Sequence, residues 1–383
     1  MIPPARYADR LARLADVSAS RGIAAVLVGV GPDLEYLTGY RALPLERLTM
    51  LVVIPGREPL LVVPRLERPA AQAGTRTPLA LRTWDETDDP YEVVLADVAG
   101  PGAGTCVVAV SDRLWASHLL RIQARLGSDP RFDRFEVRAA STVLRELRMV
   151  KDEDEIDLLR RAARAADRVV AAIAAGALVG RTEADVAREV RERLVAEGHE
   201  TASFAIVGSG PNSASPHHDA SDRVIRAGEA IVLDIGGALG GYGSDITRTL
   251  WVTGGDPAKR PDERFLHLFG VLRAAQEEAT RAVRPGVSCE AIDGVARERI
   301  TSAGFGERFI HRTGHGIGLE EHEDPYLVAG NPEPLREGMA FSIEPGIYVE
   351  GDYGARIEDI VVCGADGPIV LNEAPRDLFV VDG

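Results

Sequence analysis

Two aspartates stand on either side of a glycine-rich segment in the second half of the chain. Asp234 follows the apolar run 230–233, and Asp245 begins a second strand-like run that reaches Leu250. For either residue alone, capping a turn is the commoner role. Across a hairpin, however, two carboxylates about 4 Å apart repel by roughly 4 kcal/mol at an effective dielectric of 20. A bound cation would offset this repulsion, so the pair indicates a metal site.

Three of the eight histidines fall within twelve residues and are interspersed with glycines. The histidines are His311, His315 and His322, and the glycines are Gly314, Gly316 and Gly318. A single histidine is more often a hydrogen-bonded structural residue than a ligand. Glycine permits close backbone approach and unusual dihedral angles, and it argues against a helical HExxH type of metal site.

Two glutamates complete a set of charged residues on β-like segments. Glu344 follows the apolar run 340–343 and precedes a Pro-Gly turn. Glu358 lies within an apolar strand predicted over 354–362. A charged residue inside such a strand is tolerated when it is paired or bound to a metal.

The resulting set of two Asp, one His and two Glu predicts a two-metal site. Two divalent ions would balance the four carboxylates. Oxygen-rich ligation with one imidazole favours Mn²⁺, Co²⁺ or Zn²⁺ over the metals of a thiolate site. Two such ions that share carboxylates can hold a hydroxide at neutral pH and polarise a carbonyl, which is metal-assisted amide hydrolysis. The spacing supports the site, and the reaction type remains a hypothesis at this point.

The elements that must position these residues fall into two predicted domains. Short helical and strand-like stretches alternate over the first 140 residues, including a hairpin over 48–64, which predicts an α/β domain without a phosphate loop or GxGxxG fingerprint. Near residues 145–150 the character changes to an acidic first turn followed by an alanine-rich helix that ends at about residue 175. We therefore predict domains over 1–147 and 148–383.

Composition excludes several classes of function. The chain has 383 residues, 45% of them hydrophobic and 27% charged, which suits a two-domain globular protein. The formal net charge of −15 disfavours nucleic acid and anionic membranes as partners. No apolar run is long enough to span a bilayer, the N-terminus lacks signal-peptide features, and three scattered cysteines are typical of reduced thiols. We expect a cytoplasmic protein.

The residue pattern resembles the pita-bread metallopeptidases, specifically the Xaa-Pro peptidase family with its prolidase and aminopeptidase P branch. The match covers most of residues 150–383, and the order Asp, Asp, His, Glu, Glu is complete. The separations are 11 residues from Asp234 to Asp245, 29 from His315 to Glu344 and 14 from Glu344 to Glu358. Methionine aminopeptidases share the order but have a longer gap between the two glutamates.

The N-terminal part also resembles this family. The segment Tyr36-Leu37-Thr38-Gly39 is similar to a signature of its creatinase-type N-terminal domain. The resemblance implies a creatinase-like α/β N-terminal domain, an α+β pita-bread C-terminal catalytic domain, and a homodimer.

The resemblance implies that five residues bind two divalent metal ions, with Mn²⁺ as the first choice and Co²⁺ or Zn²⁺ as alternatives. Asp234 would chelate one ion, and His315 and Glu344 the other. Asp245 and Glu358 would bridge the two ions. Glu344 would also act as a catalytic base and then acid, relaying a proton from the attacking water to the leaving amine.

Other residues would contact the substrate by the same resemblance. His217 and His322 match catalytic histidines that hydrogen-bond the substrate and the developing oxyanion. His218 is the alternative to His217. Three substrate-binding candidates match positions that line the proline side of the pocket or support the ligands: His311, Tyr348 and Arg356. For the arginine, pairing with a ligand carboxylate is an equal alternative.

The implied function is hydrolysis of the Xaa-Pro bond in dipeptides or short peptides by a metal-bridging hydroxide. Tyr326 departs from the pattern, because some prolidases have an arginine there that holds the dipeptide carboxylate. Whether the chain is a dipeptidase or an aminopeptidase therefore stays open. The alternatives are another metal-dependent amide hydrolase on this fold and a non-catalytic binding protein derived from it.

Overall fold

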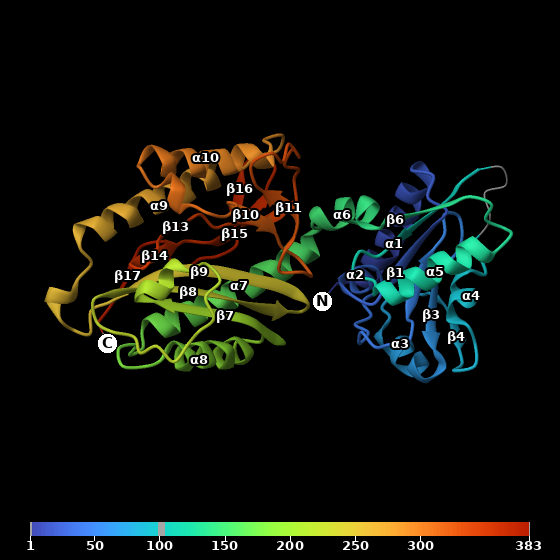
Figure 1. The fold of residues 1–383 in the computed structure, drawn as a ribbon, viewed down its shortest axis with the longest axis horizontal. Coiled ribbons are helices and arrows are strands. Elements are labelled where there is room, and N and C mark those ends of the chain that lie inside the picture. The colour runs from blue at the N-terminus through green and yellow to red at the C-terminus, as the bar shows by residue number, and fades with distance from the viewer. Residues whose placement is uncertain (1, 99–103, 383) are drawn as a thin grey trace. The chain divides into compact units, whose positions relative to one another are not determined.

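The structure is a computed structural model that describes residues 2–98 and 104–382. These residues form two compact units, one from Ile2 to Arg148 and the other from Met149 onward (Figure 1). No helix in the described ranges combines the length and the hydrophobicity that crossing a bilayer requires.

The first unit contains one six-stranded mixed sheet flanked by helices. Its strands are β1 (Ala25–Gly29), β2 (Met50–Val53), β3 (Leu60–Pro64), β4 (Ala80–Trp84), β5 (Cys106–Val110) and β6 (Phe135–Ala139). Its helices are α1 (Pro4–Ser20), α2 (Pro32–Thr38), η1 (Arg65–Glu67), α3 (Arg68–Gly74), α4 (Pro90–Leu95), α5 (Ala116–Ser128) and α6 (Ser141–Met149). The strand order is β4-β3-β2-β1-β5-β6, with β1–β2 and β2–β3 antiparallel. The hairpin β2–β3 and the α/β class agree with the sequence prediction.

The second unit contains two helix pairs and two main sheets. Its helices are α7 (Glu153–Ala174), α8 (Glu183–Ala196), η2 (Gly210–Ala214), η3 (Pro257–Lys259), α9 (Glu263–Ala282), α10 (Cys289–Ser302) and η4 (Gly306–Arg308). Its first strands are β7 (Thr201–Ser209), β8 (Glu229–Leu239), β9 (Tyr242–Val252), β10 (Gly314–Gly316), β11 (Glu323–Leu327) and β12 (Ala340–Ile343). The others are β13 (Gly346–Val349), β14 (Tyr353–Arg356), β15 (Asp359–Cys363), β16 (Pro368–Val370) and β17 (Phe379–Val381).

The strands of this unit lie between the two helix pairs. One sheet has the order β17-β9-β8-β7, the second β11-β10-β12-β15-β16, and β13 pairs with β14. Helices α7 and α8 pack on β7–β9, and α9 and α10 pack on strands of the other group (Figure 1). Strands β14 and β15 contact β9, so the two groups of strands meet in the middle of the unit.

Strand β8 shows why Asp234 faces the interior of the unit. Ile231, Leu233 and Ile235 belong to the apolar cluster formed with α7 and α8. Because side chains alternate between the two faces of a strand, Asp234 points to the opposite face, toward β14. The continuous apolar run that the sequence shows is thus a strand covered on both sides.

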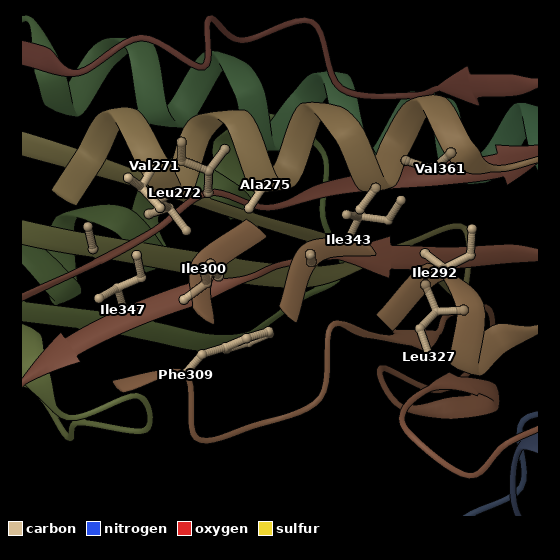
Figure 2. Packing of buried hydrophobic residues seen from close by; sticks show 14 of the residues in the cluster. Val271, Leu272, Ala275, Ile292, Ile300, Phe309, Leu327, Ile343, Ile347 and Val361 are labelled. Carbon is tan, nitrogen blue, oxygen red and sulfur yellow. The ribbon is translucent and has the colours of Figure 1, made fainter. Parts of the chain in front are cut away.

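A second apolar core fixes the strands next to the two predicted glutamates. Leu272 and Ala275 of α9 pack with Ile343 of β12, Ile347 of β13 and Val361 of β15 (Figure 2). Each fully buried Leu or Ile contributes about 1.5–3 kcal/mol. This packing helps to position the ends of β12 and β15, next to which the two predicted glutamates lie.

Glu358 is not inside a strand, which corrects the sequence prediction. It lies in the two-residue segment 357–358 between β14 and β15, and Glu344 lies in the equivalent segment 344–345 between β12 and β13. At 344–345 the chain leaves the β12–β15 sheet for the β13–β14 hairpin, and at 357–358 it returns from the hairpin to the sheet. The interruption releases each glutamate from the strand alternation, so both can turn toward the same space.

The glycines around His315 serve close packing. A Cβ at Gly314 would lie 1.9 Å from the carbonyl oxygen of Ser342, and one at Gly316 would lie 2.2 Å from that of Asp324. The predicted close approach is therefore confirmed. The predicted unusual dihedral angles are wrong, because none of the three glycines 314, 316 and 318 has a positive φ.

We predict that Gly314→Ala destabilises the protein by about 1–3 kcal/mol, because the new methyl group would force β10 away from the backbone of β12. Thermal unfolding of the metal-free protein measures this effect. The control is Gly270→Ala, whose Cβ would meet nothing within 4 Å in the middle of α9. Equal stability of the two variants would contradict the tight β10–β12 contact.

Candidate functional site

The two aspartates are brought onto one face of a β-hairpin. Strands β8 and β9 are joined by Gly240 and Gly241, which both have positive φ, as a type I′ turn requires. In the ladder Asp234 lies opposite Thr247, and Asp245 lies opposite Gly236. Their offset of two positions puts both carboxylates on the same face. The predicted pairing across a glycine-rich hairpin is present.

His315 offers an unprotonated nitrogen to this face. Its Nδ1 lies 3.1 Å from the carbonyl oxygen of Gly316, which can only accept a hydrogen bond. Burial lowers the pKa of His315 to about 3, so the ring is neutral at pH 7. The proton therefore resides on Nδ1, and Nε2 keeps its lone pair. Nε2 lies 3.3 Å from Glu344 Oε1 and 3.6 Å from Asp245 Oδ2.

Backbone and side-chain hydrogen bonds fix the two glutamates. The amide of Glu344 donates to the carbonyl oxygen of Thr313 at 2.8 Å, and that of Glu358 donates to the carbonyl oxygen of Thr247 at 3.1 Å. Thr247 Oγ1 also donates to Glu358 Oε2 at 2.7 Å. Glu358 Oε1 lies 4.0 Å from His315 Nε2. Asp234 lines the same cavity as these four residues, so all five predicted ligands converge.

The donor set fits divalent cations. One ligand atom each from Asp245, His315 and Glu358 lies within 4.8 Å of the others. Three carboxylate oxygens in the cluster are buried without a hydrogen-bond partner: Asp234 Oδ1, Asp245 Oδ1 and Glu358 Oε1. An unpaired buried carboxylate oxygen costs several kcal/mol unless a charge or donor faces it. These three oxygens accept no hydrogen bond, and bound metal ions would supply the missing partners.

Mutual repulsion and burial perturb the acids of the cluster. Burial raises the pKa of Glu344 to about 7, although Arg356 opposes the shift. Burial, with the neighbouring carboxylates, also raises the pKa of Asp245 and of Glu358 well above the usual values. In the absence of cations, the cluster therefore holds protons at neutral pH, which cations would displace.

Arg356, Tyr348 and His311 form a hydrogen-bonded chain behind the acids. Arg356 donates to Asp234 Oδ2 at 2.5 Å and to the Tyr348 hydroxyl oxygen at 2.7 Å. That hydroxyl also lies 2.9 Å from His311 Nε2. Burial raises the pKa of Tyr348 to about 12 and lowers that of His311 to about 4, so both groups are neutral.

A cavity of about 550 Å³ opens onto this cluster. Of the residues predicted from the sequence, its walls include Asp234, Asp245, His315, Glu344, Glu358, His217, His322, His311 and Arg356. Tyr348 is not among its wall residues and acts on Arg356 and His311 from behind. The cavity therefore brings the predicted ligands and the predicted substrate contacts to one space.

The structure separates the two adjacent histidines of the His217–His218 pair. His217 lines the cavity, whereas His218 Nε2 lies 2.8 Å from Glu183 Oε2. Glu183 is fully buried and also accepts hydrogen bonds from Ser209 and Ser221. These bonds lower its pKa to about 2, despite its burial. Glu183 thus anchors the loop that presents His217.

His322 stands beside the predicted ligand His315. The two ring centroids are 4.0 Å apart. Burial lowers the pKa of His322, so its ring is neutral at pH 7. Its Nδ1 lies 3.4 Å from a nitrogen of Arg312, which can only donate. This contact favours the tautomer with the proton on Nε2.

Several residues of the site were missed by the sequence prediction. Phe204 and Ile206 line the cavity from one face of β7, and Arg312 and Glu321 line it from the histidine-rich segment. Glu183 was missed because an acid in the first turn of a helix normally stabilises the helix dipole. Arg312 lies directly after His311, so its position within the histidine-rich segment could have indicated that it belongs to the site.

Two family models match the chain. Residues 157–365 match metallopeptidase family M24, and residues 10–150 match the creatinase/prolidase N-terminal domain. The matched ranges cover most of each structural unit. They confirm the expected creatinase-like and pita-bread architecture.

Similar proteins agree over almost the whole chain. The probable dipeptidase PepE of Mycobacterium tuberculosis is 47% identical over 378 residues, covering 98% of this chain and 96% of that protein. The crystal structure of dipeptidase PepE from Mycobacterium ulcerans has a TM-score of 0.90 and 44% identity and covers 99% of both chains. Prolidase from Thermococcus sibiricus has a TM-score of 0.87 and 34% identity, with 98% of both chains covered. The chain therefore belongs to metallopeptidase family M24 and carries its creatinase/prolidase N-terminal domain.

Proposed function

We propose that this chain is a metal-dependent peptidase that hydrolyses the Xaa-Pro bond of dipeptides or short peptides. The observation that carries the proposal is the group of buried, unpartnered carboxylate oxygens around the neutral His315 ring, in the wall of a cavity of about 550 Å³. Membership of a metallopeptidase family supports peptide hydrolysis. The names of the relatives, dipeptidase and prolidase, support small peptides as substrates.

The five converging residues would hold two divalent ions. We assign Asp234, Asp245, His315, Glu344 and Glu358 as the ligands, with Mn²⁺ as the first choice and Co²⁺ or Zn²⁺ as alternatives. Their oxygen-rich donor set with one imidazole suits these metals. When bound, such cations supply the Lewis acidity that lowers the pKa of water and polarises a carbonyl group.

Glu344 is the best placed proton carrier. Its carboxylate lines the cavity and lies 3.3 Å from His315 Nε2, and a carboxyl group can both accept and donate a proton. Ser342 Oγ donates to Glu344 Oε1 at 3.3 Å and orients the carboxylate. We assign Glu344 to take the proton of the attacking water and to deliver it to the leaving amine.

The remaining wall residues would bind and orient the peptide. His217 and neutral His322 are assigned to hydrogen-bond the substrate and the oxyanion that develops on its carbonyl oxygen. Phe204 and Ile206 supply an apolar surface suited to a proline ring. His311 is assigned to the same side, with Tyr348 and Arg356 holding it and Asp234 in position.

We predict that Mn²⁺-loaded protein hydrolyses Ala-Pro or Ala-Pro-Ala and that a chelator abolishes the activity. Amine release measures the reaction, and Ala-Ala and Ala-Ala-Ala serve as matched substrates without proline. A clear preference for the proline substrates would support Xaa-Pro specificity. Cleavage of Ala-Pro alone would identify a dipeptidase, and cleavage of Ala-Pro-Ala an aminopeptidase.

Other outcomes of the same assay would contradict the proposal. Equal cleavage of Ala-Ala and Ala-Pro would show that the protein is a peptidase without a preference for proline. Bound metal without cleavage of any of these peptides would favour another amide hydrolase on this fold. Failure to bind metal would favour a non-catalytic binding protein.

We predict that His322→Ala lowers kcat by about 10²- to 10³-fold, the scale of losing one oxyanion donor, while both metal ions stay bound. Steady-state kinetics and metal analysis of the purified variant measure the two effects. His267→Ala is the control, because His267 lies on α9 and is not a wall residue of the cavity. Loss of metal from His322→Ala would show that His322 is a ligand.

A further inference from the structure

The cavity walls contain two arginines, and their surroundings differ. Arg356 is buried, and its guanidinium is occupied by Asp234, Tyr348, Thr247 and the carbonyl oxygen of Pro216. Arg312 is half-buried, and in the described parts of the chain no carboxylate forms an ion pair with it. Arg312 is thus a cation in the cavity wall that the protein itself leaves without an anionic partner.

Arg312 is nevertheless held in place. Its guanidinium carbon lies 4.5 Å from the centre of the Tyr326 ring, a cation–π arrangement. Tyr326 lies opposite His315 in the β10–β11 ladder, so its side chain shares a face with this predicted ligand. Stacking on a ring restrains the guanidinium plane and leaves most of its N–H donors at the edge unused.

The surroundings of Arg312 favour an anion from the substrate. Glu321 also lines the cavity, but no ion pair joins it to Arg312. A fixed guanidinium with free donors matches a carboxylate, which can accept two of its hydrogen bonds at once. In a dipeptide, only the nitrogen and Cα of the second residue separate the α-carboxylate from the scissile carbonyl carbon. Both groups can therefore occupy one cavity of about 550 Å³.

We propose that Arg312, held by Tyr326, binds the free α-carboxylate of the substrate and thereby selects dipeptides over longer peptides. This inference rests on the proposed function, and it concerns the part of the substrate that does not react. A longer peptide carries an uncharged amide at this position and cannot form the ion pair. Arg312 acts as a specificity-determining residue, and Tyr326 as the residue that positions it.

The test compares two ligands of the Mn²⁺-loaded protein by calorimetry. One is the reduced-amide analogue of Ala-Pro, which cannot be hydrolysed, and the other is the same analogue with a C-terminal carboxamide. We expect the wild-type protein to bind the free acid about 10- to 100-fold more tightly than the carboxamide, which is the gain in affinity expected from one hydrogen bond between charged groups. Arg312→Met should remove this difference by lowering the affinity for the free acid alone. Arg312→Lys should retain part of the preference for the free acid.

Controls separate this role from a structural one. Arg281→Met removes the same charge from the exposed surface of α9 and should leave the preference for the acid intact. If the wild-type protein binds both analogues equally, or if Arg312→Met weakens both equally, the proposal is wrong. Parallel assays of Ala-Pro cleavage test the proposed function separately. If the protein binds the free acid selectively through Arg312 but does not cleave Ala-Pro, the proposed function is wrong and the role of Arg312 stands.

Discussion

Four carboxylates lie in the interior beside one neutral imidazole, and their mutual repulsion is the main electrostatic constraint on the site. Asp234, Asp245, Glu344 and Glu358 converge in the interior, and Arg356 is the cation that pairs directly with one of them. Each pair of carboxylates about 4 Å apart costs roughly 4 kcal/mol at an effective dielectric of 20. The raised pKa values of three of these acids show how the folded chain meets this cost when no cation is bound.

Apolar packing, together with hydrogen bonds from neighbouring residues, holds the predicted ligands in place. The hairpin β8–β9 and the crossings between β12 and β13 and between β14 and β15 carry the acids, and helices on both sides bury the apolar faces of these strands. Gly314 and Gly316 let β10 approach its neighbours closely enough to bring in His315. A cluster of like charges can therefore be assembled before any metal is bound.

The sequence predicted the α/β domain, the ligand-bearing hairpin and the family, because apolar runs and a complete ordered motif carry that information. It placed Glu358 inside a strand, since the break between β14 and β15 has no turn residue to mark it. The anchoring of His218 by Glu183 was not predictable, because the two residues are 35 positions apart and meet only in the folded chain. Arg312 could be read as part of the motif, but its stacking on Tyr326 depends on the β10–β11 register.

Titration of the metal-free protein with Mn²⁺ in buffers of different ionisation enthalpy tests whether cations neutralise this carboxylate cluster. We expect two ions per chain and a release of protons, because cations displace protons from carboxyls whose pKa values are raised, to about 7 for Glu344. As the pH rises through 7, fewer protons should be released and the affinity should increase, since more of the acid is already ionised. Binding of fewer than two ions, or binding without proton release at pH 6, would contradict a buried carboxylate cluster that cations neutralise.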